Sequence, residues 1–147
     1  MNVRGADSAY PKVDIKMTRG LRNNNPLNIR KNNTKWQGLA EEQKDKAFFT
    51  FVAPEWGYRA ALRTLQNYKR AHGLTTIRQW VSRWAPPVEN DTEAYIKVVC
   101  QRTGMPETAE PNISNKMVMC SIVAAMSYME NGVPAVMEDI YKGWELL

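Results

Sequence analysis

Apolar and polar positions divide the chain into an N-terminal third without a sustained period and a remainder with helical spacing. Residues 1–18 are polar and contain Pro11, which predicts a flexible N-terminal arm followed by one domain over residues 19–147. Short apolar alternations then occur at residues 27–30, 36–38 and 47–51, separated by turn-forming residues. This pattern predicts a small antiparallel β-hairpin region.

From Pro54 onward, apolar residues recur at the spacing of one helix face, between local start and stop signals. The fold class that we predict is therefore α+β, mainly helical, with the small hairpin region near the N-terminus. The predicted helices begin at Pro54, at a Thr76–Gln79 capping box, at an Asn90 cap, at Asn115 and at Pro134, and the first four end before Gly73, Pro86, Gly104 and Gly132.

The predicted helix over residues 115–132 is an almost unbroken apolar run that ends in the carboxylate of Glu130. Burying an ionised carboxylate without a partner is costly, so apolar surroundings favour the protonated acid. A protonated carboxyl is what a general acid needs, which makes Glu130 the candidate catalytic residue. The alternative is a solvated glutamate before a C-capping Asn-Gly pair.

Residues 22–30 concentrate amide and guanidinium groups, among them Asn24, Asn25 and Arg30. Amides offer donors and acceptors to the hydroxyl and acetamido groups of sugars, which favours a sugar-facing hairpin. The alternative is a structural loop, because Asn side chains also close turns.

A second polar segment covers residues 83–95, where Trp84 and Tyr95 frame Asn90 and Thr92. Capping of a helix N-terminus explains many polar residues in such a position. It does not explain the flanking aromatic residues, which are typical of carbohydrate clefts. We therefore include these four residues among the candidate substrate-binding residues.

The chain has 147 residues and a net charge of +5, and the charge is uneven: residues 1–39 carry eight Lys or Arg against two Asp. A basic region suits any polyanion, including nucleic acid, a membrane surface or the acidic bacterial cell wall. No helix-turn-helix, zinc or RNA-binding signature is present, so nucleic acid is not the expected partner.

Residues 1–8 contain no apolar segment of the kind a signal peptide needs, and the apolar run 117–129 is shorter than a membrane span. We expect synthesis in the cytoplasm and no stable insertion into a membrane. His72 is the single histidine, and Cys100 and Cys120 have no CxxC spacing, so we expect free thiols, no metal site and no cofactor. His72 precedes Gly73 at a helix end, where capping is a better explanation than nucleophilic catalysis.

Several motifs, in order, resemble glucosaminidase-type peptidoglycan hydrolases and lytic transglycosylases of the lysozyme-like superfamily, and short phage and prophage lytic or virion proteins. They are Asn24-Asn25-Pro26-Leu27-Asn28-Ile29-Arg30, Trp36-Gln37-Gly38, Phe49-Thr50-Phe51, Pro54-Glu55-Trp56-Gly57-Tyr58-Arg59, Arg83-Trp84-Ala85-Pro86-Pro87, Asn90-Asp91-Thr92-Glu93-Ala94-Tyr95 and Glu130-Asn131-Gly132. In the superfamily the catalytic glutamate closes a helix that precedes the hairpin, whereas Glu130 closes a helix near the C-terminus. The resemblance therefore implies a lysozyme-like fold that is circularly permuted.

The resemblance implies cleavage of β-1,4 bonds in bacterial peptidoglycan by a monomer that acts on the wall after release or as part of a virion. Hydrolysis needs a second carboxylate, for which Asp45, Glu55, Glu89 and Asp91 are available and none stands out. A lytic transglycosylase needs none, because a hydroxyl of the muramic acid attacks. The alternatives are a non-catalytic cell-wall-binding or virion structural protein and, less favoured, a nucleic-acid binder.

Overall fold

The computed structural model describes residues 17–147, which fold into six helices. The predicted arm over residues 1–18 therefore lies almost entirely outside the described residues. The helices are α1 (Arg19–Arg22), α2 (Pro54–His72), α3 (Ile77–Trp84), α4 (Thr92–Thr103), α5 (Lys116–Asn131) and α6 (Met137–Glu145).

Local signals explain where these helices begin and end. Pro54 occupies the first turn of α2, and Gly73 ends it in the left-handed conformation, with φ of 65°. The Thr76–Gln79 capping box of α3 is confirmed. The cap of α4 was wrongly predicted: Asp91, not Asn90, accepts the bond from the Ala94 N–H.

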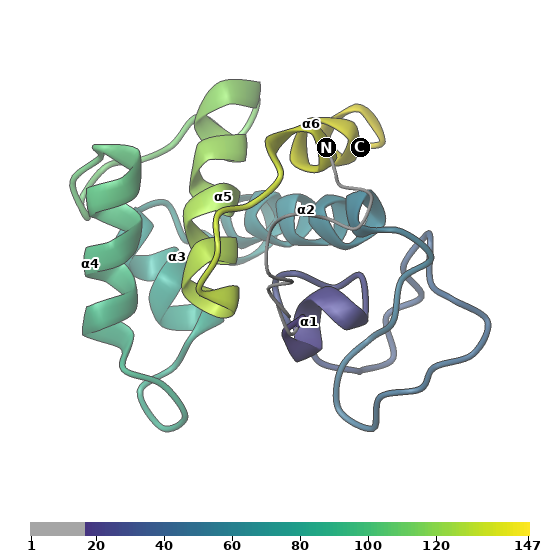
Figure 1. Ribbon diagram of the computed structural model, residues 1–147. Helices are drawn as coiled ribbons and strands as arrows, with labels where there is room; N and C mark the ends of the chain where they lie inside the picture. The colour runs from purple at the N-terminus through teal and green to yellow at the C-terminus, as the bar shows by residue number, and fades with distance from the viewer. Residues whose placement is uncertain (1–16) are drawn as a thin grey trace, which may run out of the picture.

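The predicted α+β class, with its lysozyme-like β-hairpin region, is wrong. Residues 17–147 contain no strand or sheet, and the only β pairing among them is two isolated antiparallel bridges, Arg30 with Phe48 and Leu39 with Phe51. The three segments predicted to be extended belong to a long connection over residues 23–53, which we call the irregular segment. It forms the open loops to the right of α1 in Figure 1.

Side-chain amides and a carboxylate bind the backbone groups that a β-ladder would pair. The Asn25 side chain donates to the carbonyls of Ile29 and Phe49 and accepts from the Ile29 N–H. Asp45 accepts from the N–H groups of Ala47 and Phe48. Because Asn24, Asn28 and Gly38 also have positive φ, extended runs are interrupted before a ladder can form.

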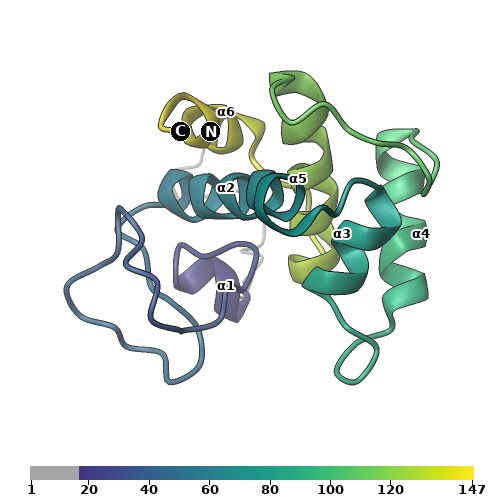
Figure 2. The same ribbon diagram turned by 180° about the vertical axis from the view of Figure 1, so that it is seen from behind.

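The main core lies among the helices around α5, which contacts α1, α2, α4 and α6. Figures 1 and 2 show α5 standing between α4 on one side and α2 with α6 on the other. A smaller apolar cluster under the irregular segment contains Phe49, Phe51 and Ala60. Among residues 17–147, no helix combines the length and the apolar character needed to cross a bilayer.

Both cysteines are free thiols. Cys120 is buried in α5, and burial raises the pKa of its thiol to about 11. Cys100 is only partly buried. Neither thiol is part of the site described below.

Candidate functional site

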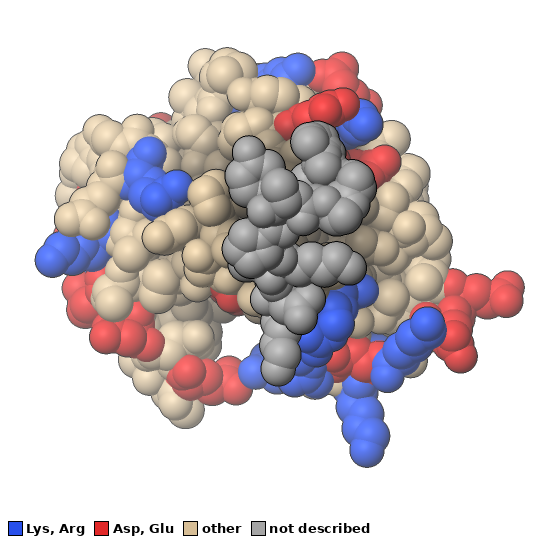
Figure 3. All heavy atoms as spheres, in the orientation of Figure 1, with Lys and Arg blue, Asp and Glu red and all other residues tan. Residues whose placement is uncertain are grey.

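An open cleft of about 590 Å³ is lined by the irregular segment on one side, by α3 and the α3–α4 connection on the other, and by the end of α2. In Figure 3 the surface is hollowed between these two parts, and acidic and basic side chains meet across the opening. Of the eight predicted site residues, Arg30, Trp84, Asn90 and Glu130 line this cleft. The volume lies within the range of small-molecule sites.

Glu130 is held in the cleft by two hydrogen bonds from residues far apart in the sequence. The Asn28 amide donates to one carboxylate oxygen at 2.8 Å, and the Tyr95 hydroxyl donates to the other at 2.9 Å. Glu130 itself is half-buried. Both oxygens are therefore fixed from two directions, which sets the orientation of the carboxyl group.

Tyr95 stays a hydrogen-bond donor to Glu130 across the neutral pH range. Its side chain is buried, and burial, followed by the negative charge of Glu130, raises its pKa well above the ordinary value. The hydroxyl therefore stays protonated throughout the neutral range. Tyr95 supports Glu130 from beneath rather than facing the open cleft.

The neighbouring residue, Asn131, explains why the Asn-rich part of the chain lies beside Glu130. The buried Asn131 amide donates to the carbonyl of Pro26 at 2.8 Å, and its oxygen accepts a bond of 2.6 Å from the Thr18 hydroxyl. These bonds join the end of α5 to Pro26 in the irregular segment and to Thr18, the N-cap of α1. Asn28 is thereby placed opposite Glu130.

Three predicted site residues have structural contacts instead. Asn25 is fully buried and Asn24 donates to the carbonyl of Phe51, so both shape the irregular segment and neither lines the cleft. Thr92 is buried and donates to the carbonyl of Ala85. Amide density in the sequence thus located the right segment without separating the residues that face the cleft from those that hold its backbone.

Four carboxylates were considered as the partner of Glu130, and only Glu89 lines the cleft. It is exposed and lies 3.3 Å from the Arg30 guanidinium across the opening. Asp45 is paired with Arg19, whose guanidinium holds the pKa of that carboxyl far below its usual range. Asp91 caps α4 and Glu55 lies in the first turn of α2.

Sequence reasoning missed the roles of Asn28, Tyr68 and Arg83. Asn28 is part of the Asn-rich motif, but no local feature of the sequence predicts its hydrogen bond to Glu130, 102 positions away. Tyr68 and Arg83 line the cleft from α2 and α3, and Tyr68 also belongs to the buried core. The cleft is also lined by Trp36, Phe48, Asn32, Asn67 and His72. The C-cap of α2 is Gly73, and His72 is the last residue of the helix.

The amino-acid sequence of this chain is similar to that of a phage protein. The chain is 39% identical over 140 residues to Protein P5 of Pseudoalteromonas phage PM2, a match that covers 92% of this chain and 86% of that protein. The chain therefore belongs to the same family as Protein P5 of that phage. No protein-family model matches it.

Proposed function

We propose that this phage protein cleaves the glycan strands of bacterial peptidoglycan, with Glu130 as the general acid. The observation that carries the proposal is the oriented Glu130 carboxyl group, held by Asn28 and Tyr95 in an open cleft. The cleft combines the faces of Trp36 and Trp84 with several amides, the combination that binds sugar rings and their acetamido groups.

In the proposed reaction, Glu130 transfers its proton to the oxygen of the scissile glycosidic bond as that bond breaks. Positive charge then develops on the ring oxygen and anomeric carbon, and the ionised Glu130 lies beside that charge. A positioned general acid contributes on the order of 10²- to 10⁴-fold in rate. The hydrogen bonds from Asn28 and Tyr95 hold the carboxyl in place during this transfer and stabilise the carboxylate that results.

Two routes complete the reaction, and they differ in the group that attacks the anomeric carbon. Hydrolysis uses water activated by a second carboxylate, for which Glu89 is the candidate among the described residues that line the cleft. Transglycosylation uses a hydroxyl of the muramic acid and forms an anhydro end. Mass spectrometry of digested peptidoglycan distinguishes them, because only the hydrolysis product gains a water molecule.

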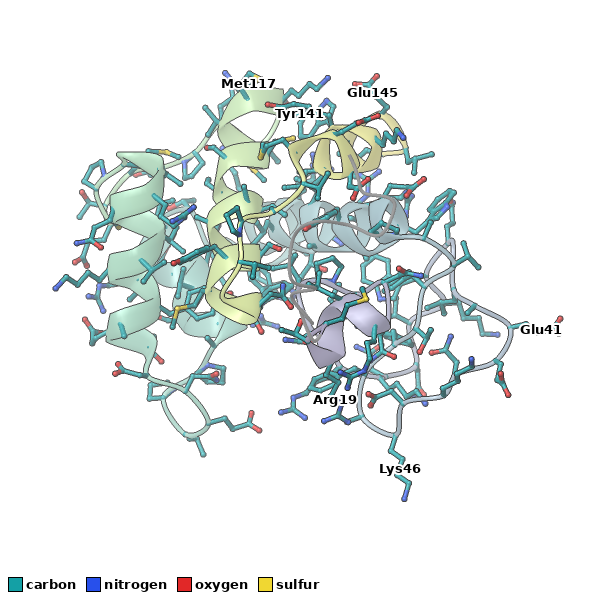
Figure 4. The ribbon with its side chains drawn as sticks, viewed as in Figure 1. Arg19, Glu41, Lys46, Met117, Tyr141 and Glu145 are labelled. Carbon is teal, nitrogen blue, oxygen red and sulfur yellow. The ribbon has the colours of Figure 1, made fainter. Side chains whose placement is uncertain are left out.

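The proposal is tested by replacing Glu130 with Gln, which keeps the shape and removes the transferable proton. Release of fragments from purified peptidoglycan should fall by at least about 100-fold, while the thermal unfolding midpoint stays close to that of the wild type. Glu41→Gln is the matched control: Glu41 points away from the molecule at the outer edge of the irregular segment (Figure 4) and should leave activity unchanged.

The alternative is a cell-wall-binding or virion structural protein that uses the same cleft without turnover. It predicts that the wild-type protein binds peptidoglycan and releases no fragments. Equal fragment release by wild-type protein and Glu130→Gln would instead show that another group is the acid.

A further inference from the structure

The cleft carries positive charge on both walls, and the two arginines differ in their partners. Arg30 on the irregular segment is paired with Glu89 across the opening. Arg83 on α3 also lines the cleft and is exposed. Within residues 17–147, no carboxylate lies at ion-pairing distance from Arg83. Among the residues that the structure describes, Arg83 is therefore a cation in the cleft without a carboxylate partner.

Tyr68 holds the Arg83 guanidinium in position. The guanidinium carbon lies 5.5 Å from the centre of the Tyr68 ring, a cation–π contact that restricts the long side chain. Tyr68 is itself buried, and burial raises its pKa to about 12 against the opposing charge of Arg83. Arg83 has five N–H donors, and those that Tyr68 does not engage remain for a carboxylate, which a guanidinium can match with two parallel bonds.

Arg83 also lies near the proposed reaction centre. Arg83 and Glu130 line the same cleft, and Tyr68, on which Arg83 rests, lines it too. The neighbouring Trp84 lines the same cleft and is partly exposed. Because Trp84 directly follows Arg83 in the chain, a sugar ring bound beside Trp84 would bring its substituents near the Arg83 guanidinium.

We propose that Arg83 binds a carboxylate carried by the glycan strand and so selects an acidic glycan over a neutral one. This inference rests on the proposed function, because it concerns the same cleft. In peptidoglycan the carboxylate has two sources: the lactyl group of a muramic acid without a peptide, or the attached peptide, whose amide bond consumes the lactyl carboxylate. Both present the same chemistry to a guanidinium.

The test measures binding to Glu130→Gln protein, so that no ligand is cleaved. Three tetrasaccharides are compared: the neutral N-acetylglucosamine oligomer, the peptide-free alternating glucosamine–muramic acid oligomer, and the same oligomer with peptides. Adding Arg83→Gln should weaken binding of the carboxylate-bearing ligands by about tenfold and leave the neutral oligomer unchanged. The acidic ligand that shows the larger loss identifies the source of the carboxylate.

Arg102→Gln is the matched control, because Arg102 is also exposed and stacks on a tyrosine, Tyr128, at 3.7 Å, but lies outside the cleft. It should leave all three affinities unchanged. Arg83→Lys keeps the charge and loses the bidentate guanidinium, so it should retain only part of the preference. Equal binding of neutral and acidic oligomers by the Glu130→Gln protein would overturn the inference about Arg83 and leave the proposed function standing. Absence of binding to all three oligomers would overturn both the inference and the proposed function.

Discussion

At the scale of single residues, the central feature is that both oxygens of Glu130 accept hydrogen bonds from side chains outside α5. One donor, Asn28, sits in the irregular segment in the left-handed region, with φ of 53°. The other, Tyr95, lies on α4 and is only 3% exposed. These donors act on the reaction through Glu130. Matched control variants distinguish their effect on activity from their effect on the stability of the fold.

Replacing Tyr95 with Phe removes the hydroxyl that holds one oxygen of Glu130. We expect peptidoglycan cleavage to fall by about tenfold or more, mainly in kcat, and the free energy of unfolding to fall by about 1 kcal/mol. Tyr58→Phe is the matched control, since Tyr58 is equally buried and its hydroxyl contacts another α5 residue, Ser127, at 3.0 Å. Urea unfolding and initial rates measure both effects. An equal loss of activity in the two variants would contradict a specific role for Tyr95.

Asn28→Gly removes the second donor while keeping a residue that tolerates positive φ. Cleavage should fall by about tenfold, because Glu130 is then held by Tyr95 alone. Asn24→Gly is the control: Asn24 has nearly the same backbone angle, with φ of 52°, and its amide binds the carbonyl of Phe51 instead. It should reduce stability and leave the activity of the folded protein unchanged. The reverse result would place the functional amide at Asn24.

At the scale of elements, the irregular segment forms one wall of the cleft without the regular hydrogen bonding of a sheet. Its shape depends on side-chain amides and on close packing against α2. At Gly38, where φ is 81°, an added Cβ would lie 2.2 Å from the Trp56 ring, so a larger residue must displace that ring or the backbone.

Gly38→Ala should therefore lower the free energy of unfolding by more than about 2 kcal/mol, because steric overlap adds to the cost of positive φ. Gly73→Ala isolates the conformational term: Gly73 has φ of 65°, and an added Cβ would meet nothing within 4 Å. We expect a loss of about 1 kcal/mol there. Chemical denaturation of both variants measures the difference, and equal losses would show that the contact with Trp56 relaxes freely.

At the scale of the whole molecule, an ion pair joins the irregular segment to α1. Arg19 lies on α1 (Figure 4), and its guanidinium makes two hydrogen bonds of 2.6 Å to Asp45. The hydrogen bond from Arg19 lowers the pKa of Asp45 from its ordinary value of 3.8. Desolvation opposes this shift, and the backbone N–H groups of Ala47 and Phe48 add to it. A lowered pKa in the folded state means that the stabilisation is present above pH 3.8 and is lost as the pH falls below it.

Asp45→Asn should consequently destabilise the protein at pH 7 and have a smaller effect at pH 3. Urea unfolding at both values tests the sign. Glu42→Gln serves as the control, because Glu42 and Lys44 are both largely exposed and 3.8 Å apart, so little pH-dependent stability is expected from that pair. A difference between wild type and Asp45→Asn that stays constant from pH 7 to pH 3 would contradict the role of the ionised Asp45.

The sequence by itself indicated the helices from Pro54 onward, because apolar periodicity and capping residues act within a few positions of each other. Two starts were wrong: α4 is capped by Asp91 rather than Asn90, and α6 begins at Met137 rather than Pro134. It also indicated Glu130, Arg30, Trp84 and Asn90 by their residue types, and all four line one cleft. The sheet was wrong because Asn25 and Asp45 compete for the backbone groups that alternation alone would assign to a ladder. The contact between Asn28 and Glu130 was decided by the tertiary structure, since it spans 102 positions and depends on Asn131 binding Pro26.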